Sequence, residues 1–453
     1  MTASGTSDPI DLSMPLIVGF GITGQAVAAV LIERGHLPIV IDDRPGASAI
    51  EAADVMGIEL VAAPSDAALS EVVDRATVLL PSPGVPDAHP VFACAAATGV
   101  SIRSEFDLAQ LWDDRPIVAI TGTNGKTSVT MLVTAALEAS GLRAEAVGNT
   151  PTPLVAAIGD AEIDVFVVEA SSFRLAHSHC FRPSVATWMN FAPDHLDAHA
   201  DLETYRQAKA SIWSHLGPDA VAVANLDDGT VMQAAPVGAI TFGSTAGDWH
   251  IEGDHLVGPE GPLVSIERLA RRRPHDLSNA ACVAATAIAA GATAEGVAAA
   301  LESFEGLPHR LALVGEWNDV SWFNDSKATV PQATIAAVGG FDSVVLIAGG
   351  RNKGLDLGEL ATAVPPVHTV VATGDAADEI AAAFAGTGVD IVLGTSMVEA
   401  IDLAAGASRP GDTILLSPAC TSFDWYENYG QRGDDFVSLV TAKFESSSAA
   451  ANQ

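Results

Sequence analysis

The sequence predicts an α/β protein built from parallel sheets, and three observations support this fold class. Short apolar runs recur along the chain, and most are followed by a Gly-rich or polar turn and then by an alanine-rich helical pattern. Strands that are apolar throughout are typical of parallel sheets that carry helices on both faces. The same order of elements restarts more than once, so we expect several α/β domains in succession.

The expected elements follow one another in a regular order. Helices lie between most of the strands, and the clearest helical patterns cover 24–34, 126–140 and 396–404. Each predicted strand is an apolar run that ends near a turn signal. These strands are expected at 16–20, 38–41, 77–80, 117–121, 165–169, 185–190, 220–224, 343–348, 368–372, 390–393 and 412–416.

The length and two breaks in the pattern indicate three domains. At about 150 residues per domain, a chain of 453 residues allows about three. Polar, Gly and Pro residues interrupt the pattern at 104–116, before a new strand, and at 305–310, after a helical stretch. We therefore predict domains at 1–104, 105–307 and 308–453.

The composition excludes some classes of partner. The chain has 22 basic and 56 acidic residues, which gives a net charge of −34 with neutral histidines. A nucleic-acid-binding protein needs a basic face, and binding to an anionic membrane needs basic clusters, so neither partner is expected. The densest basic run, at 271–273, is interpreted as a solvated loop.

The protein is expected to be cytoplasmic. The first residues show no secretory signal, and the longest alanine-rich stretch, 280–290, is too short to span a bilayer. The four cysteines (Cys94, Cys180, Cys282 and Cys420) are far apart and form no CxxC pair. We therefore expect reduced, mostly buried thiols, without zinc and without disulfides.

The most informative motif is a Gly-rich loop between the strand at 117–121 and the helix at 126–140. Backbone N–H groups of such a loop, together with the positive end of the helix, hold phosphate oxygens. In this pattern Lys126 can reach the β- and γ-phosphates, and the Thr127 hydroxyl can ligate Mg²⁺. The strict phosphate-loop pattern requires Gly at position 120, where Ile stands, so the match is to a shorter variant, Gly122-x-x-Gly125-Lys126-Thr127. An ordinary strand–turn–helix is the alternative.

Other polar residues follow predicted strands. Glu169 ends one strand and His195 follows the next, and ligands of parallel sheets collect at the carboxyl ends of strands. Both residues are therefore candidates to hold a metal near the phosphates, although a lone histidine is more often structural. Lys209 lies on a helical pattern, where a surface lysine is the simplest interpretation.

Two further regions are candidate binding sites. The pattern Gly19-x-Gly21-x-x-Gly24, with Asp42 about 20 residues on, is typical of dinucleotide binding and suits a uridine diphosphate group equally well. Segments 324–329, 349–354 and 417–424 combine small residues with hydroxyls or a lysine. They suit a small carboxylated substrate, and generic loops are the alternative.

Together these motifs resemble a known family. Residues 121–127 resemble the ATP loop of the Mur ligase and folylpolyglutamate synthase superfamily. The stretches at 306–310, 323–329 and 415–424 are similar to those of its D-glutamate-adding members, and the likeness runs in order from about residue 16 to residue 440. The resemblance implies a Rossmann-like UDP-binding domain, a central phosphate-loop ATPase domain and a Rossmann-like C-terminal domain.

The resemblance also implies a reaction. ATP would phosphorylate the carboxylate of UDP-N-acetylmuramoyl-L-alanine, and the amine of D-glutamate would attack the acyl phosphate through a tetrahedral intermediate. This is a cytoplasmic step of peptidoglycan synthesis, carried out by a monomer without membrane insertion. Another Mur-type or folylpolyglutamate synthase-like ligase with a different amino acid is one alternative, and a nucleotide-binding module without catalysis is another.

By resemblance, individual residues take individual roles. Lys126, His195 and Lys209 would be catalytic, and two Mg²⁺ ions would be held by Thr127 and Glu169 and by His195 and a carbamoylated Lys209. The ATP site would comprise Gly122, Thr123, Asn124, Gly125, Lys126, Thr127, Asn279, Arg310 and Asp325; the UDP-sugar site Ile22, Thr23, Asp42, Arg44, Ser82, Gly84 and Asn149; and the D-glutamate site Thr329, Lys353, Ser422 and Tyr429.

The chain departs from the family pattern at several positions. Thr150 and Pro151 follow Asn149 where Ile-Gly is usual, Ala198 stands where arginine is common, and Tyr429 stands where phenylalanine is common. Asn352 replaces a frequent aspartate. These departures leave the phosphate loop and the metal positions unchanged, so they bear on substrate contacts more than on the type of reaction.

Overall fold

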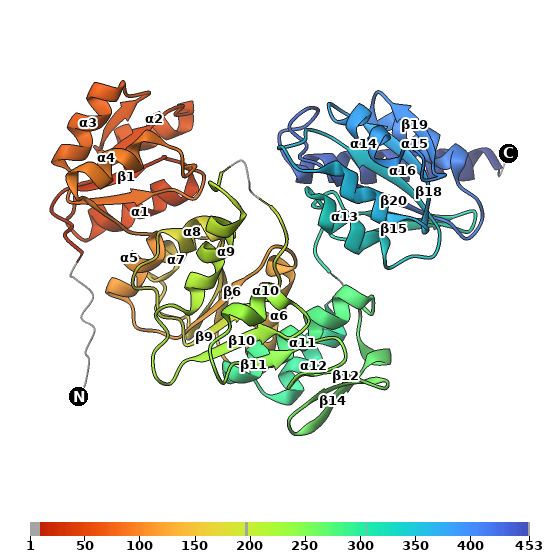
Figure 1. Ribbon diagram of the computed structural model, residues 1–453, viewed down its shortest axis with the longest axis horizontal. Helices are drawn as coiled ribbons and strands as arrows, with labels where there is room; N and C mark the ends of the chain where they lie inside the picture. Colours follow the sequence, from red (N-terminus) through yellow and green to blue (C-terminus); the bar gives the residue numbers. More distant parts are fainter. Residues whose placement is uncertain (1–9, 195–197, 305, 452–453) are drawn as a thin grey trace. The chain divides into compact units, whose positions relative to one another are not determined.

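The computed structural model describes residues 10–194, 198–304 and 306–451 (Figure 1). The chain forms two compact units. One contains the residues up to Ala270 together with Leu277–Phe304, and the other contains Arg271–Asp276 and the chain from residue 305 onward. Within the described residues, no helix combines the length and the apolar character that a membrane span requires.

The first sheet of the first unit is parallel and has the strand order β3-β2-β1-β4-β5. Apolar side chains alternate between its faces: Leu16 and Val18 pack with α3 and α4, while Ile17 packs with α1 and α2. Both faces are therefore buried, which explains the continuous apolar runs. The elements are β1 (Pro15–Val18), α1 (Ile22–Glu33), β2 (Ile39–Asp42), α2 (Ala47–Met56), β3 (Glu59–Ala62), α3 (Asp66–Arg75), β4 (Val78–Pro81), α4 (Pro90–Thr98) and β5 (Ser101–Ile102).

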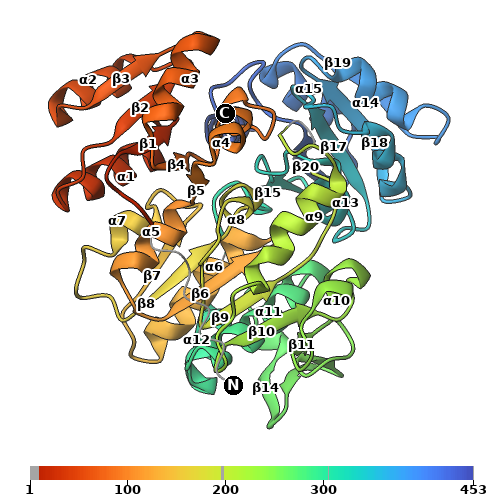
Figure 2. The ribbon, with the colours of Figure 1, turned by 60° about the vertical axis from the view of Figure 1, so that its left-hand side comes forward.

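The second sheet of this unit is also parallel and has the order β11-β10-β9-β6-β8-β7; Figure 2 shows these strands side by side. Helices α6, α11 and α12 cover one face, and α5, α7 and α8 pack on the other. The elements are α5 (Glu105–Trp112), β6 (Ile117–Thr121), α6 (Lys126–Ala139), β7 (Ala144–Gly148), α7 (Leu154–Ala157), β8 (Val165–Glu169), α8 (Ser172–Ala176), β9 (Val185–Trp188), α9 (Leu202–Ala210), η1 (Ser211–Trp213), β10 (Val221–Asn225), α10 (Gly229–Ala234), β11 (Ile240–Phe242), α11 (Pro274–Ala289) and α12 (Ala294–Ser303).

The second unit contains a six-stranded sheet of order β15-β16-β20-β17-β18-β19. Helices α13 and α14 and the 3₁₀ helix η3 cover one face, and α15 and α16 cover the other. The elements are β15 (Ala312–Trp317), β16 (Val320–Asn324), α13 (Pro331–Val338), β17 (Val344–Gly349), η3 (Leu357–Ala363), β18 (Val367–Thr373), α14 (Ala377–Phe384), β19 (Asp390–Gly394), α15 (Met397–Ala407), β20 (Thr413–Ala419) and α16 (Tyr429–Ala451).

The predicted α/β fold class is confirmed, and a strand is present at each predicted position, with shifts of a few residues at the ends. The expectation of parallel sheets alone is wrong in two places. A small antiparallel sheet contains β12 (His250–Glu252), β13 (His255–Gly258) and β14 (Gly261–Ser265), followed by the 3₁₀ turn η2 (Ile266–Arg268). The edge pair β15–β16 is antiparallel as well. These strands mix polar and apolar residues because one side of each is open to solvent.

The interpretation of the arginine run as a solvated loop is wrong for two of its three residues. The Arg273 guanidinium lies over the rings of Phe323 and Phe341, at 4.7 Å and 4.4 Å from their centroids. Arg271 donates from Nε to Asp276 at 2.9 Å. Only Arg272 is exposed. The run is therefore part of the packing of the second unit. The four cysteines are free thiols, and Cys282 and Cys420 are buried.

Candidate active site

The Gly-rich loop lies at the carboxyl edge of the second sheet, between β6 and α6. Gly125 has φ of +82°, and a Cβ atom there would lie 2.9 Å from Met189 Cε and 3.0 Å from Asn279 Oδ1. Only glycine fits this conformation and this close approach. The loop thus turns tightly onto the start of α6, and the N-terminus of a helix is a favourable position for an anion. Asn279, a predicted ATP residue, lies against the loop.

Asn190, which the sequence did not single out, holds this loop in shape. Its Oδ1 accepts hydrogen bonds from the backbone N–H groups of Thr123 and Asn124, both at 2.9 Å, and its Nδ2 donates to the Asn124 carbonyl at 3.0 Å. The residue follows β9, which pairs with β6. Its position after a neighbouring strand is the signal that could have identified it.

Two lysines converge on one carbonyl of the loop. The Gly122 oxygen accepts from Lys126 Nζ at 2.8 Å and from Lys209 Nζ at 2.7 Å. Lys209 is 1% exposed, and its Nζ lies 4.5 Å from the centroid of the Tyr205 ring. Burial, and then the nearby Lys126 cation, hold the pKa of Lys209 well below its ordinary value. The interpretation of Lys209 as a surface lysine is therefore wrong, and its burial favours the neutral amine over the ammonium.

Glu169 brings a buried carboxylate to the same edge of the sheet. It is 2% exposed, and its Oε1 accepts from Asn149 Nδ2 at 3.0 Å. Its Oε2 is buried and has no hydrogen-bond partner among the described residues. An unsatisfied buried oxygen is costly, whereas a hard cation such as Mg²⁺ takes oxygen ligands, so this donor fits a metal.

Thr127 lies in the first turn of α6, and His195 lies outside the described residues. The described part of the chain contains no group of three or more His, Cys, Asp and Glu side chains that could hold a metal by themselves. Mg²⁺ is commonly bound by one or two protein oxygens together with substrate phosphates. Thr127 and Glu169 beside a phosphate loop match that mode of binding.

A pocket of about 630 Å³ opens at the carboxyl ends of β1, β2 and β4 in the first sheet. The Gly-rich turn after β1 forms one wall; a Cβ atom on Gly24 would collide with the Gly19 carbonyl. Asp42 braces this turn, accepting from the backbone N–H of Phe20 at 2.7 Å and of Arg44 at 2.8 Å. The structure brings all seven predicted UDP-sugar residues to this pocket: Ile22, Thr23, Asp42, Arg44, Ser82, Gly84 and Asn149.

In the second unit, Asp325 is buried after β16. It accepts from Ser417 Oγ at 2.8 Å and from the backbone N–H of Leu311 at 3.2 Å. Burial raises the pKa of Asp325 to about 6, against the opposing effects of Ser417 and Arg310. Arg310 stands between His309 and Leu311, whose φ values are +60° and +48°. Such strained backbone persists where the surroundings require a specific side-chain position.

The raised pKa of Asp325 predicts a pH effect on stability. A folded-state value near 6 against about 3.9 in the unfolded chain means that the fold gains stability below about pH 4 and loses it as pH rises through 6. We expect Asp325→Asn to remove this component, about 1.4 kcal/mol for each unit of pKa difference. Thermal unfolding of the two proteins between pH 4 and 7 measures it, with the exposed Asp390→Asn as a control. Parallel curves for the wild type and Asp325→Asn would contradict the prediction.

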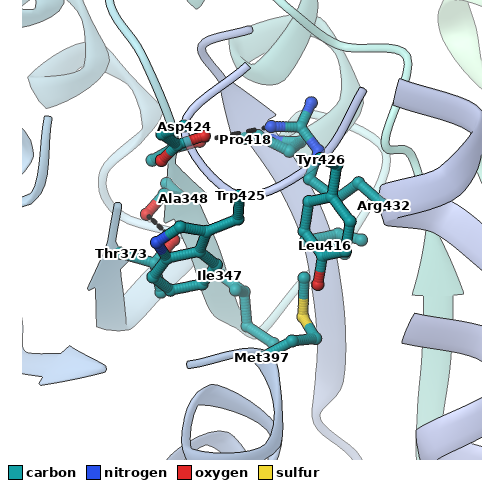
Figure 3. A pocket seen from close by; sticks show the side chains of 12 residues that line it. Ile347, Ala348, Thr373, Met397, Leu416, Pro418, Asp424, Trp425, Tyr426 and Arg432 are labelled. Atoms are coloured by element: carbon teal, nitrogen blue, oxygen red, sulfur yellow. Dashed lines mark hydrogen bonds between the residues drawn. The ribbon is translucent and has the colours of Figure 1, made fainter. Parts of the chain in front are cut away.

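The predicted D-glutamate residues lie on segments that the structure joins. Ser422 is buried, Thr329 is partly buried, and Tyr429 accepts at its hydroxyl from Lys327 Nζ at 2.9 Å. A small pocket of about 10 Å³, room for roughly one water molecule, opens at the carboxyl ends of β17 and β20 (Figure 3). Thr329, Lys353, Ser422 and Tyr429 are not among its lining residues.

Arg432, which the sequence did not single out, ties these segments together. Its guanidinium donates to five acceptors, and it carries no carboxylate partner among the described ion pairs. The three segments proposed from the sequence as a small-substrate site, 324–329, 349–354 and 417–424, thus meet at one buried cation. The acceptors are Ser326 Oγ at 2.9 Å and the carbonyls of Ser326 at 2.8 Å, Cys420 at 3.1 Å, Thr421 at 3.3 Å and Gly349 at 3.5 Å.

The sheets and the loop define the class: a modular α/β protein with a phosphate-binding loop at the carboxyl edge of a parallel sheet. Three family models match in order, namely the Mur ligase MurD-like N-terminal domain over 14–104, the Mur ligase middle domain over 120–261 and the Mur ligase glutamate ligase domain over 309–420. The chain therefore belongs to the Mur ligase family, as its motifs indicated.

Curated relatives match almost the whole chain. Proteins named UDP-N-acetylmuramoylalanine–D-glutamate ligase from Frankia casuarinae and Desulfosudis oleivorans are each 38% identical over 94% of this chain, covering 94% and 95% of their own lengths. Among solved structures, MurF from Acinetobacter baumannii has a TM-score of 0.60 at 18% identity, covering 94% of this chain and 90% of its own. UDP-N-acetylmuramate–alanine ligase MurC from Thermotoga maritima has a TM-score of 0.58 at 18% identity, with coverages of 95% and 99%. These structures support the fold.

Proposed function

We propose that this chain is the ATP-dependent ligase that joins D-glutamate to UDP-N-acetylmuramoyl-L-alanine in peptidoglycan synthesis. One observation carries the proposal: a phosphate loop with its lysine in place, in a chain 38% identical over 94% of its length to ligases named for this reaction. The pocket of the first sheet suits the UDP group, and the carboxyl edge of the second sheet suits ATP.

The chemistry follows from the reactants. A carboxylate is a poor electrophile until one of its oxygens carries a good leaving group. The γ-phosphoryl group of ATP passes to a carboxylate oxygen of UDP-N-acetylmuramoyl-L-alanine, releasing ADP. The D-glutamate nitrogen then forms a bond to the carbonyl carbon and loses a proton, and phosphate leaves as the C–O bond breaks. Lys126 and the N–H groups at the start of α6 stabilise the charge on the transferring group.

Thr127 and Glu169 would hold one Mg²⁺ ion, and His195 and Lys209 a second. Bound Mg²⁺ would neutralise charge where two anionic reactants meet. Burial favours the neutral form of the Lys209 amine, and a neutral amine can add to carbon dioxide with loss of one proton. The resulting carbamate supplies oxygens in place of a nitrogen that metal ions of this type do not favour. The Gly122 carbonyl would then keep only Lys126 as its side-chain donor.

Three further properties belong to the proposal. The matched ranges of the family models support domains at 1–104, 105–307 and 308–453. Free thiols and nucleotide substrates support a cytoplasmic location. We also propose that the protein works as a monomer, since the Gly-rich loop and the pocket of the first sheet both belong to one chain.

Release of ADP or phosphate tests the function directly. Purified protein with ATP, Mg²⁺ and UDP-N-acetylmuramoyl-L-alanine is assayed against a panel of L- and D-amino acids. We expect turnover with D-glutamate and little with the others. Preference for L-lysine or diaminopimelate would assign a different Mur-type reaction, and no turnover with any amino acid would support a binding module.

Amino-acid choice should depend on Lys353. We expect its ammonium to pair with a carboxylate of D-glutamate, while Thr329 and Ser422 donate hydrogen bonds. Loss of a hydrogen bond to a charged group costs about 1.5–3 kcal/mol, so Lys353→Ala should raise the KM for D-glutamate roughly 10- to 100-fold. The KM for ATP should change far less, and D-glutamine should be a poor substrate.

Steady-state kinetics with each substrate varied in turn give both KM values. Arg351→Ala removes a cation of the same loop, whose guanidinium is 55% exposed and pairs with Asp375, and serves as the matched control. Equal effects of the two substitutions on the KM for D-glutamate would show that Lys353 is not a specific contact.

A further inference from the structure

A continuous line of side-chain hydrogen bonds joins the pocket of the first sheet to the carboxylate beside the phosphate loop. Arg174, in α8, donates from Nη2 to Thr23 Oγ1 at 3.0 Å and from Nη1 to Asn149 Oδ1 at 3.1 Å. Asn149 in turn donates from Nδ2 to Glu169 Oε1 at 3.0 Å. Thr23, Asn149 and Arg174 all line the pocket, and Glu169 ends β8.

One edge of the Arg174 guanidinium is anchored in the protein. Its side chain is 5% exposed, and Nε donates to Glu105 Oε1 at 3.0 Å. The second oxygen of Glu105 accepts from the backbone N–H of Val155 at 3.0 Å. The planar guanidinium therefore has one edge anchored in the protein and two nitrogens aimed at the pocket, a geometry that a lysine cannot reproduce.

The line of bonds determines which polar atoms remain available at each end. A hydroxyl has one donor and two acceptor sites, so Thr23, accepting from Arg174, keeps its O–H to donate to a ligand in the pocket. Asn149 must present Oδ1 to Arg174 and Nδ2 to Glu169, which fixes the orientation of its amide. Glu169 then has Oε1 occupied, and its buried Oε2 has no hydrogen-bond partner among the described residues.

We propose that Arg174 is a positioning residue that couples occupation of the UDP-sugar pocket to nucleotide binding at the phosphate loop. It does so by holding Thr23 at one end and, through the Asn149 amide, the Glu169 carboxylate at the other. Fixing Thr23 by a bound diphosphate restrains the guanidinium, and this reduces the freedom of Asn149 and Glu169. The inference rests on the proposed function for the identity of the two ligands.

Coupling between two ligands is a ratio of affinities and is reciprocal. A substitution that changes the affinity for one ligand by the same factor with and without the other ligand leaves this ratio unchanged. The ratio therefore separates coupling from a merely structural role. We would measure by calorimetry the affinity for a non-hydrolysable ATP analogue with Mg²⁺, with and without saturating UDP-N-acetylmuramoyl-L-alanine and without D-glutamate. The wild type should show coupling of roughly 5-fold or more.

The matched variants are Thr23→Val and Thr23→Ser. Thr23→Val keeps the shape and removes the hydroxyl that accepts from Arg174, so coupling should fall to within about twofold of unity. Thr23→Ser keeps the hydroxyl and should keep the coupling. Both leave the Arg174–Glu105 ion pair in place, so they remain informative if Arg174→Ala fails to fold. Arg174→Lys and Arg174→Ala should lose coupling as Thr23→Val does, whereas Arg143→Ala, a surface cation paired with Asp164, should not.

Retained coupling in Thr23→Val or in Arg174→Lys would overturn the inference, as would the absence of coupling in the wild type. Turnover of the wild type in the amino-acid panel separates this failure from failure of the proposed function. If the wild type is an active ligase but shows no coupling, only the proposed role of Arg174 is rejected. If the wild type binds no UDP-sugar, the role of Arg174 and the proposed function are both rejected.

Discussion

Replacing Lys126 by alanine is expected to lower turnover by at least about 10²- to 10³-fold, the usual cost of removing one preorganised charge-stabilising donor. Lys126 Nζ donates to the Gly122 and Thr123 carbonyls at 2.8 Å and 3.1 Å, at the mouth of the loop that would hold the phosphates. The positive charge of Lys126 at this position would stabilise the negative charge on the transferring phosphoryl group.

Stability should change little, because the Lys126 side chain is only partly buried and lies outside the apolar clusters of the second sheet. ADP release and thermal unfolding of the same preparations measure the two quantities. The control for loss of one positive charge is Lys443→Ala. Lys443 lies on α16 and pairs with Asp402 of α15. Near wild-type turnover of Lys126→Ala would remove the assignment of this loop to phosphate binding.

Lys209 is expected to carry a carbamate in the active enzyme, and Lys209→Ala should reduce turnover by orders of magnitude. The physical reason is the shared Gly122 carbonyl. Two ammonium groups within hydrogen-bond distance of one oxygen repel each other, and burial favours the neutral form of Lys209. Neutral amines react with carbon dioxide, and the product reverses the charge at this position.

A carbamate carbon signal after labelling with ¹³C-bicarbonate, and electron density beyond Nζ at better than about 2 Å, would detect the modification. Arg206→Ala, on the same helix α9 but paired with Glu203 at the surface, is the control. Denaturing mass spectrometry is unsuitable because the carbamate is labile in acid. Unmodified density in an active crystal form, together with full activity of Lys209→Ala, would contradict the assignment.

The strands that the sequence predicted carry apolar residues on both faces. The strands that it missed do not. Glu59 and Ala62 of β3 are exposed, and β12 to β14 carry polar residues on one side, so neither run stands out from a loop. The Gly-rich loops were predictable for a related reason. Gly125 has a positive φ and close neighbours that disfavour a side chain, so glycine is required there. The requirement for glycine can be read directly from the sequence.

The candidate site was only partly predictable. The burial of Lys209 had a usable signal: Tyr205, Ala208 and Lys209 are spaced as one face of a helix, and all three are buried. Arg174 and Arg432 had none. Arg174 contacts Thr23, 151 positions away in the chain, and Arg432 contacts Ser326, 106 positions away, and only the assembled sheets bring such partners together.

The arm formed by Arg271–Asp276 has a practical consequence for anyone dissecting the protein. The chain passes between the two units after Ala270, after Asp276 and after Phe304, so no single cut separates them. A fragment that starts at residue 305 would leave Phe323 and Phe341 without the guanidinium that covers them, and Arg310 without the Arg271 bond to its carbonyl. A stand-alone amino-acid-binding module would therefore need those six residues grafted back onto it.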